Sequence, residues 1–477
     1  MRRMAISRRQ FLERSAAGAV LLSIGAAPAA AQQRLTRAQV NALRDAVSGR
    51  VFTPGNSGYN AARVVFNQRF ANVRPPAVVR VRNPADVSAV VKWANRYDIA
   101  LTSRSGGHAY NGASTSSQAV VVDLGALDGI SLQDGIATIG PGARNIDAYA
   151  ALARRGATIA SGSCPTVGIG GITLGGGMGL AGRALGLSLD RVRGFTAVTA
   201  DGRRRTVDAQ DNEDLFWALR GGGGSFAIVT SIKTRVRRVS RAAWFSISYP
   251  AGSRTAALDA WDDLAPSAPQ ELTAILTLTP TGASAFGQYL GSESALRRLV
   301  GPLTQVAGAS LGIGTSGWLD LQKRWAGCAD GGLAACRRYE PSMFDASSVY
   351  VAKKLSAAAR RAFVSAADGG ATLICDAYGG AIGEVAPSAT AFVHRKVRFS
   401  VQILSYAPFA TARSRVRNAR RLIAPFGNGQ AYQNYPDLDI ANARRAYYGS
   451  NYERLVQIKT ELDPDNRFQV AQGIRPS

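Results

Sequence analysis

The fold of this chain is decided by two glycine-containing segments, which are Ser103-Arg104-Ser105-Gly106-Gly107-His108-Ala109-Tyr110 and Gly162-Ser163-Cys164-Pro165-Thr166-Val167-Gly168-Ile169-Gly170-Gly171. Glycine has no side chain beyond a hydrogen, so backbone N–H groups in such segments can closely approach an anionic ligand. A pyrophosphate fits between two turns of this kind. His108 and Cys164 would then stand beside the ligand, and both are nucleophiles when deprotonated. We therefore expect the two segments to meet at one ligand site.

The bulk composition is that of a folded enzyme. The chain has 477 residues, enough for two or three domains, and is 46% apolar and 19% charged. Its formal net charge of +25 would draw it to anionic surfaces. The Lys and Arg residues are scattered, however, and form no long basic run or known nucleic-acid-binding module. We expect an arginine-rich surface and no nucleic-acid partner.

The N-terminus has the parts of an export signal. Paired arginines stand in Ser7-Arg8-Arg9-Gln10-Phe11-Leu12, the apolar stretch Ala16–Ala27 follows, and Ala29-Ala30-Ala31 offers a cleavage site. The arginine pair before Phe-Leu resembles a twin-arginine signal. The alternative is a membrane anchor, but the stretch is shorter than the ~20 residues that cross a bilayer. We expect residues 1–31 to be a twin-arginine signal peptide. The protein would then be exported, to the periplasm or beyond, with no stable membrane anchor.

The cysteines and histidines favour a disulfide over a metal site. Cys328 and Cys336 flank a loop rich in Gly and Ala that can close on itself, and an exported protein keeps its disulfides. Two free thiols are the alternative. The chain has only His108 and His394 and no paired C-x-x-C units, so we expect no metal.

The hydrophobic pattern predicts two mixed halves of the chain. The first half alternates short strands with helices, whereas the glycine clusters thin out after about residue 240. Strands are predicted near 77–81, 99–102, 120–124, 137–139, 195–200, 226–234, 244–249, 273–279 and 398–406. Helices are predicted from Asn83 onward and at 143–155, 215–219, 254–264, 292–300, 410–423 and 451–462.

A formal G-x-G-x-x-G at Gly177, Gly179 and Gly182 raises the alternative of a nicotinamide-binding Rossmann domain. A Rossmann unit needs a regular helix after the glycines, which packs on the sheet and faces the pyrophosphate. The residues that follow, Arg183–Gly194, include two glycines and lack a clean amphipathic period. We therefore disfavour this interpretation.

Taken together, the two segments resemble the flavin loops of the berberine-bridge-enzyme-like FAD-linked oxidases, and more specifically the branch of carbohydrate and oligosaccharide oxidases. The resemblance covers nearly the whole mature chain. It continues in Leu215–Gly224, in Tyr447–Leu455 with Lys459, and in Asp463–Phe468 with Gln472.

The resemblance implies an α+β fold. A PCMH-type FAD-binding domain of two α/β subdomains is joined to a substrate domain with an antiparallel sheet covered by helices. The implied division of the chain is a lead-in at 32–72, the FAD-binding domain at 73–239, the substrate domain at 240–430, and a segment at 431–477 that returns to the FAD domain.

The resemblance also implies that FAD is held by two covalent bonds. His108 matches the residue that bonds the flavin 8α-methyl carbon, and Cys164 matches the residue that bonds C6. A tethered cofactor cannot dissociate, so the pocket need not enclose it. The further cofactor-binding residues that the resemblance implies are Arg104, Ser105, Gly106, Gly107, Thr166, Val167, Gly168, Gly170, Gly171, Gly176, Gly177, Tyr448 and Asn451.

The expected catalytic residues come from two further segments. Tyr432-Gln433-Asn434-Tyr435 resembles the family's Y-x-N-Y motif, whose second tyrosine is the base in its sugar oxidases. A free tyrosine has a pKa near ~10, so it needs a neighbour that favours its proton loss or accepts its proton. Asp376 matches that partner, and Tyr378 is expected as a second catalytic tyrosine. Gln402 stands where the alkaloid branch has a carboxylate, and glutamine cannot act as a base, which favours hydroxyl oxidation.

The sequence therefore predicts an FAD oxidase that acts on an alcohol or a sugar hemiacetal. Val167 matches the position that gates oxygen in the family, and valine there is typical of oxidases that reduce O₂ to hydrogen peroxide. One alternative is a dehydrogenase on the same scaffold with another electron acceptor. A second, from another class, is an exported basic binding protein without redox activity. The substrate would be a small molecule or a sugar.

Overall fold

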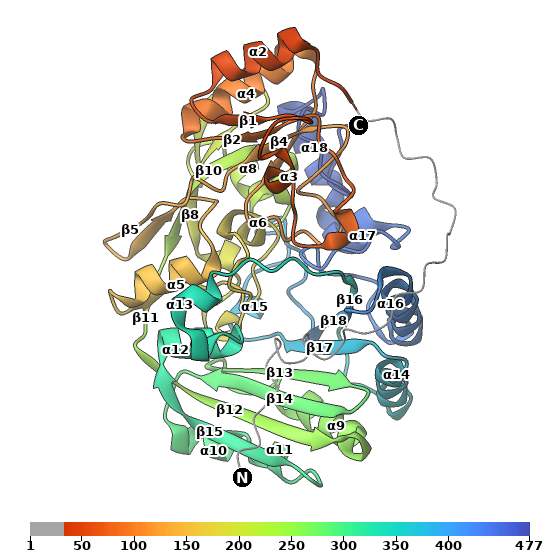
Figure 1. The fold of residues 1–477 in the computed structure, drawn as a ribbon. Coiled ribbons are helices and arrows are strands. Elements are labelled where there is room, and N and C mark those ends of the chain that lie inside the picture. The colour runs from red at the N-terminus through yellow and green to blue at the C-terminus, as the bar shows by residue number, and fades with distance from the viewer. Residues whose placement is uncertain (1–32) are drawn as a thin grey trace.

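The computed structural model describes residues 33–477, so the predicted signal peptide at 1–31 lies outside the described residues. Three main sheets carry the fold: two lie at the top of Figure 1 and the largest lies at the bottom. The predicted α+β class, with an antiparallel sheet covered by helices in the second half, is confirmed. The predicted domain boundaries stay predictions. No helix among residues 33–477 is long and apolar enough to cross a membrane.

The first sheet has four strands in the order β1-β2-β4-β3. Strands β2, β3 and β4 are parallel, and β1 joins them antiparallel. Helix α4 begins where predicted, since the Asn83 side chain accepts a hydrogen bond from the Asp86 N–H and Pro84 occupies the first turn. Its valines pack onto the sheet. The elements are α2 (Arg37–Ala46), β1 (Arg50–Phe52), α3 (Tyr59–Ala62), β2 (Val78–Arg80), α4 (Pro84–Tyr97), β3 (Leu101–Arg104) and β4 (Val120–Asp123).

The second sheet is antiparallel, with five strands in the order β5-β6-β10-β8-β9. Its elements are β5 (Ile130–Gln133), β6 (Ile136–Ile139), α5 (Asn145–Ala153), α6 (Ile169–Leu174), α7 (Gly182–Leu185), β8 (Val192–Val198), β9 (Arg204–Asp208), α8 (Glu213–Leu219) and β10 (Ile228–Arg235). A separate two-stranded pair joins β7 (Ala157–Thr158) to β11 (Arg237–Arg238). Only the four-residue α7 and a short 3-10 turn separate the glycines of the G-x-G-x-x-G from β8. That is not the crossover helix of a Rossmann unit.

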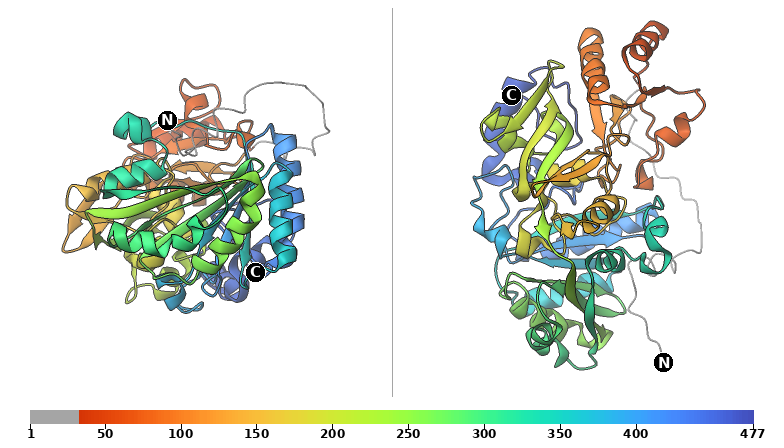
Figure 2. Two further views of the ribbon diagram at one scale, coloured as in Figure 1. Left: turned by 90° about the horizontal axis from the view of Figure 1, so that it is seen from below. Right: turned by 90° about the vertical axis from the view of Figure 1, so that its left-hand side faces the viewer.

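The third sheet has seven antiparallel strands in the order β15-β12-β14-β13-β17-β18-β16. The strands are β12 (Arg241–Pro250), β13 (Leu272–Thr279), β14 (Gly282–Tyr289), β15 (Ser310–Gly317), β16 (Asp345–Val351), β17 (Thr372–Ala377) and β18 (Phe399–Ser405). The helices of this half are α9 (Arg254–Leu264), α10 (Glu293–Leu299), α11 (Gly301–Thr304), α12 (Trp318–Trp325), α13 (Gly332–Cys336), α14 (Ala357–Asp368), α15 (Ala381–Glu384) and α16 (Phe409–Ile423). Apolar side chains of α9, α10, α11, α14 and α16 share one core with one face of the sheet. Figure 2 shows α14 and α16 along the side of the sheet. These helices do not cover the opposite face of the seven-stranded sheet.

Side-chain alternation sorts the two faces of the third sheet. Cys375 of β17 and Val401 of β18 belong to the helix-covered core. Their strand neighbours Asp376 and Gln402 point to the other face, because successive side chains of a strand alternate. Ile275 of β13, which is paired with Asp376, lies on this second face too. This face looks toward the first two sheets.

The C-terminal segment returns to the first half, as Figure 1 shows for α17 (Ala443–Tyr448) and α18 (Tyr452–Leu462). Leu101 of β3 exchanges backbone hydrogen bonds with Arg467 and Gln469. Lys459 is completely buried, and its ammonium group donates to the Asp463 carboxylate and to the carbonyls of Ser225 and Phe468. Lys459 therefore links the C-terminal residues near Phe468 to the turn at Ser225, which follows helix α8.

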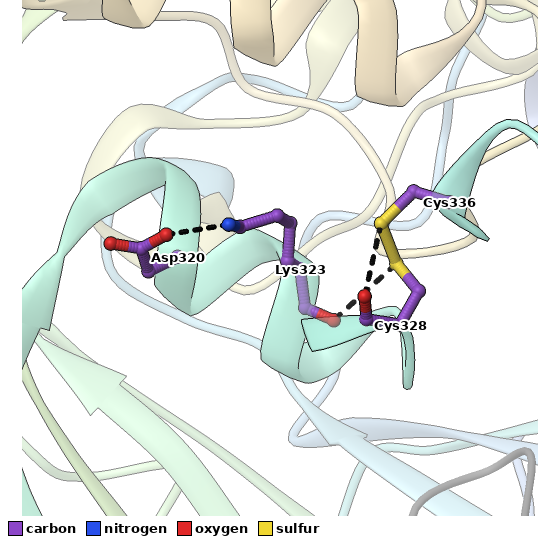
Figure 3. Close-up of a disulfide and its surroundings, with 4 residues drawn as sticks. All are labelled: Asp320, Lys323, Cys328 and Cys336. Atoms are coloured by element: carbon purple, nitrogen blue, oxygen red, sulfur yellow. Dashed lines mark hydrogen bonds and ion pairs between the residues drawn. A yellow bond between two sulfur atoms is a disulfide. The ribbon is translucent and has the colours of Figure 1, made fainter. Parts of the chain in front are cut away.

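The predicted disulfide between Cys328 and Cys336 is confirmed. Figure 3 shows it just after α12. The Cys328 N–H donates to the Lys323 carbonyl of that helix. Just after the bridge, Arg337 forms an ion pair with Asp147 of α5 at 2.7 Å. The disulfide loop is thereby tied to the second sheet's helix layer.

Removing the buried ammonium group should destabilise the fold strongly. Lys459→Ala leaves the Asp463 carboxylate buried without its partner, which costs about 3–5 kcal/mol of unfolding free energy. The matched control is Arg454→Ala, which breaks the exposed Arg454–Asp214 pair on the same helix and should cost at most about 1 kcal/mol. Urea unfolding followed by circular dichroism measures both. Equal losses for the two variants would contradict the structural role of Lys459.

Candidate active site

A large cleft separates the glycine segments from the second face of the seven-stranded sheet. Its cavity volume is about 280 Å³. Its walls come from both glycine segments, the turn after α8, the third sheet and the C-terminal segment. The predicted site residues that line it are Ser105, Gly106, Gly107, His108, Cys164, Val167, Gly168, Gly170, Gly171, Asp376, Tyr435 and Tyr448.

The two glycine segments touch backbone to backbone. A Cβ atom added to Gly106 would lie 2.4 Å from the Gly168 nitrogen, and one added to Gly168 would lie 2.4 Å from the Gly106 nitrogen. No side chain fits in that space, so glycine is required at both positions. His108 and Cys164 consequently line the same cleft although they are far apart in the sequence.

The His108 imidazole is fixed from three directions. Its Nε2 lies 3.0 Å from the Thr166 hydroxyl oxygen. Phe66 stacks on one face with ring centroids 4.1 Å apart, and Tyr339 meets the ring edge-on at 5.6 Å. Burial, with a smaller contribution from the Arg144 guanidinium, lowers the pKa of His108 to about 3. The imidazole is therefore neutral at neutral pH, which is the nucleophilic form.

Cys164 is half-buried on the opposite glycine segment. Its carbonyl accepts a hydrogen bond from the Asn145 side-chain amide at 3.0 Å, and the Asn145 carbonyl oxygen accepts one from the Ser161 hydroxyl. Asn145 is fully buried at the start of α5. This network fixes the backbone that carries the thiol.

The facing wall is polar and aromatic. The Gln402 amide donates to the Tyr110 hydroxyl at 2.6 Å. The Tyr110 ring is stacked with Tyr435, with centroids 5.8 Å apart and planes 10° from parallel. Asp376 lines the same wall from β17 and is almost completely buried. A ligand in the cleft would meet Tyr435, Asp376 and Gln402 together.

The Tyr432 hydroxyl ties the tyrosine segment to the glycine-rich side of the cleft. It accepts hydrogen bonds from the backbone N–H groups of Gly177 and Met178 and from the Asn434 amide. The same Asn434 amide donates to the Ile172 carbonyl of α6. Burial, together with the nearby Asp376 carboxylate, raises the pKa of Tyr432, so its hydroxyl keeps its proton. Tyr432 is thus a structural anchor for the segment that carries Tyr435.

Some predicted site residues lie behind the cleft wall. Tyr378 is fully buried, and its hydroxyl lies 3.0 Å from the Tyr350 hydroxyl, so the structure does not bring it to the cleft. The Asn451 amide donates to backbone carbonyls of the loop at 387–391. The Arg104 guanidinium forms an ion pair with Asp123. Gly176 and Gly177 pack against Tyr432 and Ser188, and Thr166 reaches His108.

Other cleft residues escaped prediction from the sequence. Phe66 and Tyr339 carry no motif, and only the folded chain brings them to His108. Residues 222–225 and 470–473 line the cleft as well, and of these Gly222–Gly224 and Gln472 were noted only as parts of the family resemblance. Tyr110 of the facing wall was also not predicted as a site residue. Its position two residues after His108 was the one signal in the sequence that could have indicated it. Within residues 33–477 there is no cluster of three or more His, Cys, Asp or Glu side chains that could hold a metal ion.

Comparison with known proteins identifies related chains along almost the whole length. The FAD binding domain model matches residues 75–208, and the model described as berberine and berberine like matches residues 431–475. The chitooligosaccharide oxidase of Gibberella zeae is 30% identical over 452 residues, which cover 88% of this chain and 91% of that protein.

Solved structures of the same kind superpose closely. BBE-like 1 of Physcomitrella patens gives a TM-score of 0.88 at 31% identity, covering 92% of this chain and 99% of that one. The glucooligosaccharide oxidase of Acremonium strictum, whose description names a 6-S-cysteinyl, 8α-N1-histidyl FAD, gives 0.84 at 26% identity with the same coverage. On these matches, and with the two flavin-loop segments meeting at one cleft, this chain belongs to the berberine-bridge-enzyme-like family of FAD-linked oxidoreductases.

Proposed function

We propose that this chain oxidises an alcohol or a sugar hemiacetal hydroxyl, using an FAD bonded to both His108 and Cys164, and that O₂ is reduced to hydrogen peroxide. One observation carries the proposal. The contact between Gly106 and Gly168 sets a neutral imidazole and a thiol along one cleft, whose other wall presents Tyr435 and Asp376.

The cleft residues fit a flavin dinucleotide. Gly171 and Gly223 line the cleft. A Cβ atom added to either would meet no protein atom within 4 Å, so their backbones are exposed to the cleft. Bare backbone of this kind suits close approach to a pyrophosphate. The buried oxygens of Ser114, Gln402 and Gln433 line the same cleft and find no hydrogen-bond partner among residues 33–477. FAD bound there would supply the redox chemistry by accepting a hydride from the carbon that bears the hydroxyl.

The protein must hold the substrate and remove its hydroxyl proton. In this proposal Tyr435 is the base and Asp376 is its partner. The stacked Tyr110 ring and the Gln402 amide fix the orientation of Tyr435 and offer hydrogen bonds to a polyhydroxylated substrate. The chitooligosaccharide and glucooligosaccharide oxidases among the relatives favour a sugar as the substrate.

Val167 lines the cleft three residues after Cys164 and is proposed as the small side chain that admits O₂. Export through the signal at residues 1–31 is likewise proposed. A cofactor bonded at two points suits an enzyme that works away from the cytoplasmic supply of FAD.

Both covalent bonds are directly measurable. Acid precipitation should leave the yellow colour in the pellet, and mass analysis of peptides should find FAD on those containing His108 and Cys164. His108→Ala and Cys164→Ala should each lose one linkage, and only the double variant should release its flavin into the supernatant. Colour in the supernatant of the unsubstituted protein would overturn covalent attachment.

Removing the proposed base should slow turnover without removing the cofactor. Tyr435→Phe should lower kcat by roughly 10²–10⁴-fold, the usual contribution of a general base, while the flavin spectrum is retained. The matched control is Tyr97→Phe on α4, which lies outside the cleft lining and should leave kcat unchanged. Steady-state turnover with a panel of oligosaccharides and simple alcohols measures kcat, and stopped-flow flavin reduction shows whether the reductive step is the one that slows. Unaltered kcat in Tyr435→Phe would assign the base elsewhere.

The electron acceptor is a separate question with its own measurement. An oxidase should release hydrogen peroxide in equimolar amount to product when oxygen is the only acceptor. A peroxidase-coupled assay beside product quantification decides this. Turnover that requires an artificial dye and gives little peroxide would make the protein a dehydrogenase on the same scaffold.

A further inference from the structure

We propose that the Thr166 hydroxyl selects which nitrogen of His108 attacks the flavin, by bonding Nε2 and leaving Nδ1 as the nucleophile. This inference rests on the proposed attachment of FAD to His108. It gives Thr166 a positioning role in forming the bond, distinct from contact with the cofactor.

The geometry around the ring supports one assignment of the two nitrogens. Nε2 lies 3.0 Å from the Thr166 hydroxyl oxygen, and among residues 33–477 Thr166 is the one residue that hydrogen-bonds the ring, through its hydroxyl and its backbone. A neutral imidazole carries one N–H donor and one acceptor nitrogen. With the proton on Nε2, the N–H donates to Thr166 and the Nδ1 lone pair is unengaged. In the other tautomer the Nδ1–H has no acceptor among these residues, and Thr166 can then only donate to Nε2.

The ring cannot turn to exchange its nitrogens. Phe66 covers one face at 4.1 Å and 22° from parallel, and Tyr339 closes the edge at 5.6 Å and 89°. Tyr339 is held there by the chain that follows the Cys328–Cys336 bridge, where Arg337 pairs with Asp147 and its carbonyl accepts from Arg144. Of the two nitrogens, Nδ1 is therefore the one left for the flavin methyl carbon.

The bond-forming step balances with O₂ as the oxidant. One C–H bond of the flavin 8α-methyl group breaks, and a C–N bond forms between that carbon and Nδ1. The imidazole gives up its Nε2 proton, and two electrons are left on the cofactor. O₂ takes these electrons and the two protons as hydrogen peroxide, so the linked flavin ends in its oxidised form.

A hydroxyl suits this position because it can reverse its hydrogen bond. Before attachment Thr166 accepts from the Nε2–H, and afterwards it donates to the bare Nε2. Thr166 also lies two residues after Cys164, so one segment supplies the second attachment point and orients the first. A valine of nearly the same shape has neither the donor nor the acceptor.

The test compares Thr166→Val with Thr166→Ser in the full chain, with Thr230→Val as the matched control. Thr230 is also buried and loses a hydroxyl bond, to the Thr196 carbonyl, but does not line the cleft. Cells are sampled at successive times after induction. Mass spectrometry then follows the fraction of His108 peptide and of Cys164 peptide that carries FAD, and NMR of the purified flavin peptide identifies the linked nitrogen.

We expect Thr166→Val to gain FAD on His108 roughly tenfold more slowly, the factor that about 1.4 kcal/mol represents, or to gain some of it through Nε2. Linkage at Cys164 should persist. Thr166→Ser and Thr230→Val should match the unsubstituted protein, which should be linked through Nδ1. Equal rates and Nδ1 linkage in Thr166→Val would overturn the inference.

A His108 peptide without FAD in the unsubstituted protein would instead refute the proposed attachment itself. Linkage through Nε2 in that protein would leave the attachment standing and overturn the role of Thr166. If Thr166→Val does not fold, Thr166→Ala is compared with Thr166→Ser in its place. Thermal unfolding of each variant is measured in parallel.

Discussion

The contact on which the site depends is the one between the backbones of Gly106 and Gly168. Because neither residue has a Cβ, two turns from different sheets approach as closely as two main chains can. That closeness places the Thr166 hydroxyl within hydrogen-bond distance of the His108 ring and puts His108 and Cys164 on one cleft. A single methyl group at either glycine would force the two backbones apart and separate the two side chains that we propose to bond the flavin.

The seven-stranded sheet imposes the second constraint. One of its faces packs on the helices and forms the core, and the other face carries polar side chains that line the cleft. Cys375 and Val401 are buried under the helices, while the adjacent Asp376 and Gln402 face the cleft. A slip of one residue in the pairing of β17 with β18 would bury the polar groups and expose the apolar ones. The hydrophobic core therefore fixes the register that aims the polar side chains.

The sequence predicted most elements that have a strong period or clear end signals. Helix 254–264 was predicted with its observed bounds, and α4 begins at the predicted Asn83 cap. Strand β16 was not predicted because it begins with Asp345 and Ala346, residue types that are depleted in strands, and β15 is rich in glycine. The glycine segments indicated the site because close approach of two backbones requires glycine, and clusters of glycine are visible in the sequence.

Side-chain neighbours that only the folded chain brings together left no such trace. Phe66 and Tyr339 meet His108 from distant parts of the chain. Tyr378 was expected as a second catalytic tyrosine from the family resemblance, yet the chain leaves β17 after Ala377 and carries its ring into the core beside Tyr350. Nearness along the chain does not determine on which side of a sheet a residue past the strand end will lie.

The C-terminal segment has a consequence for biosynthesis. Residues 470–473 form part of the cleft wall, and β3, which leads into the His108 turn, is bonded to Arg467 and Gln469. A ribosome makes the glycine segments long before these residues, so a nascent chain has half a cleft. Capture of the cofactor must then follow release of the finished polypeptide, and a premature stop codon that removed only the last few residues would leave the cleft without one of its walls.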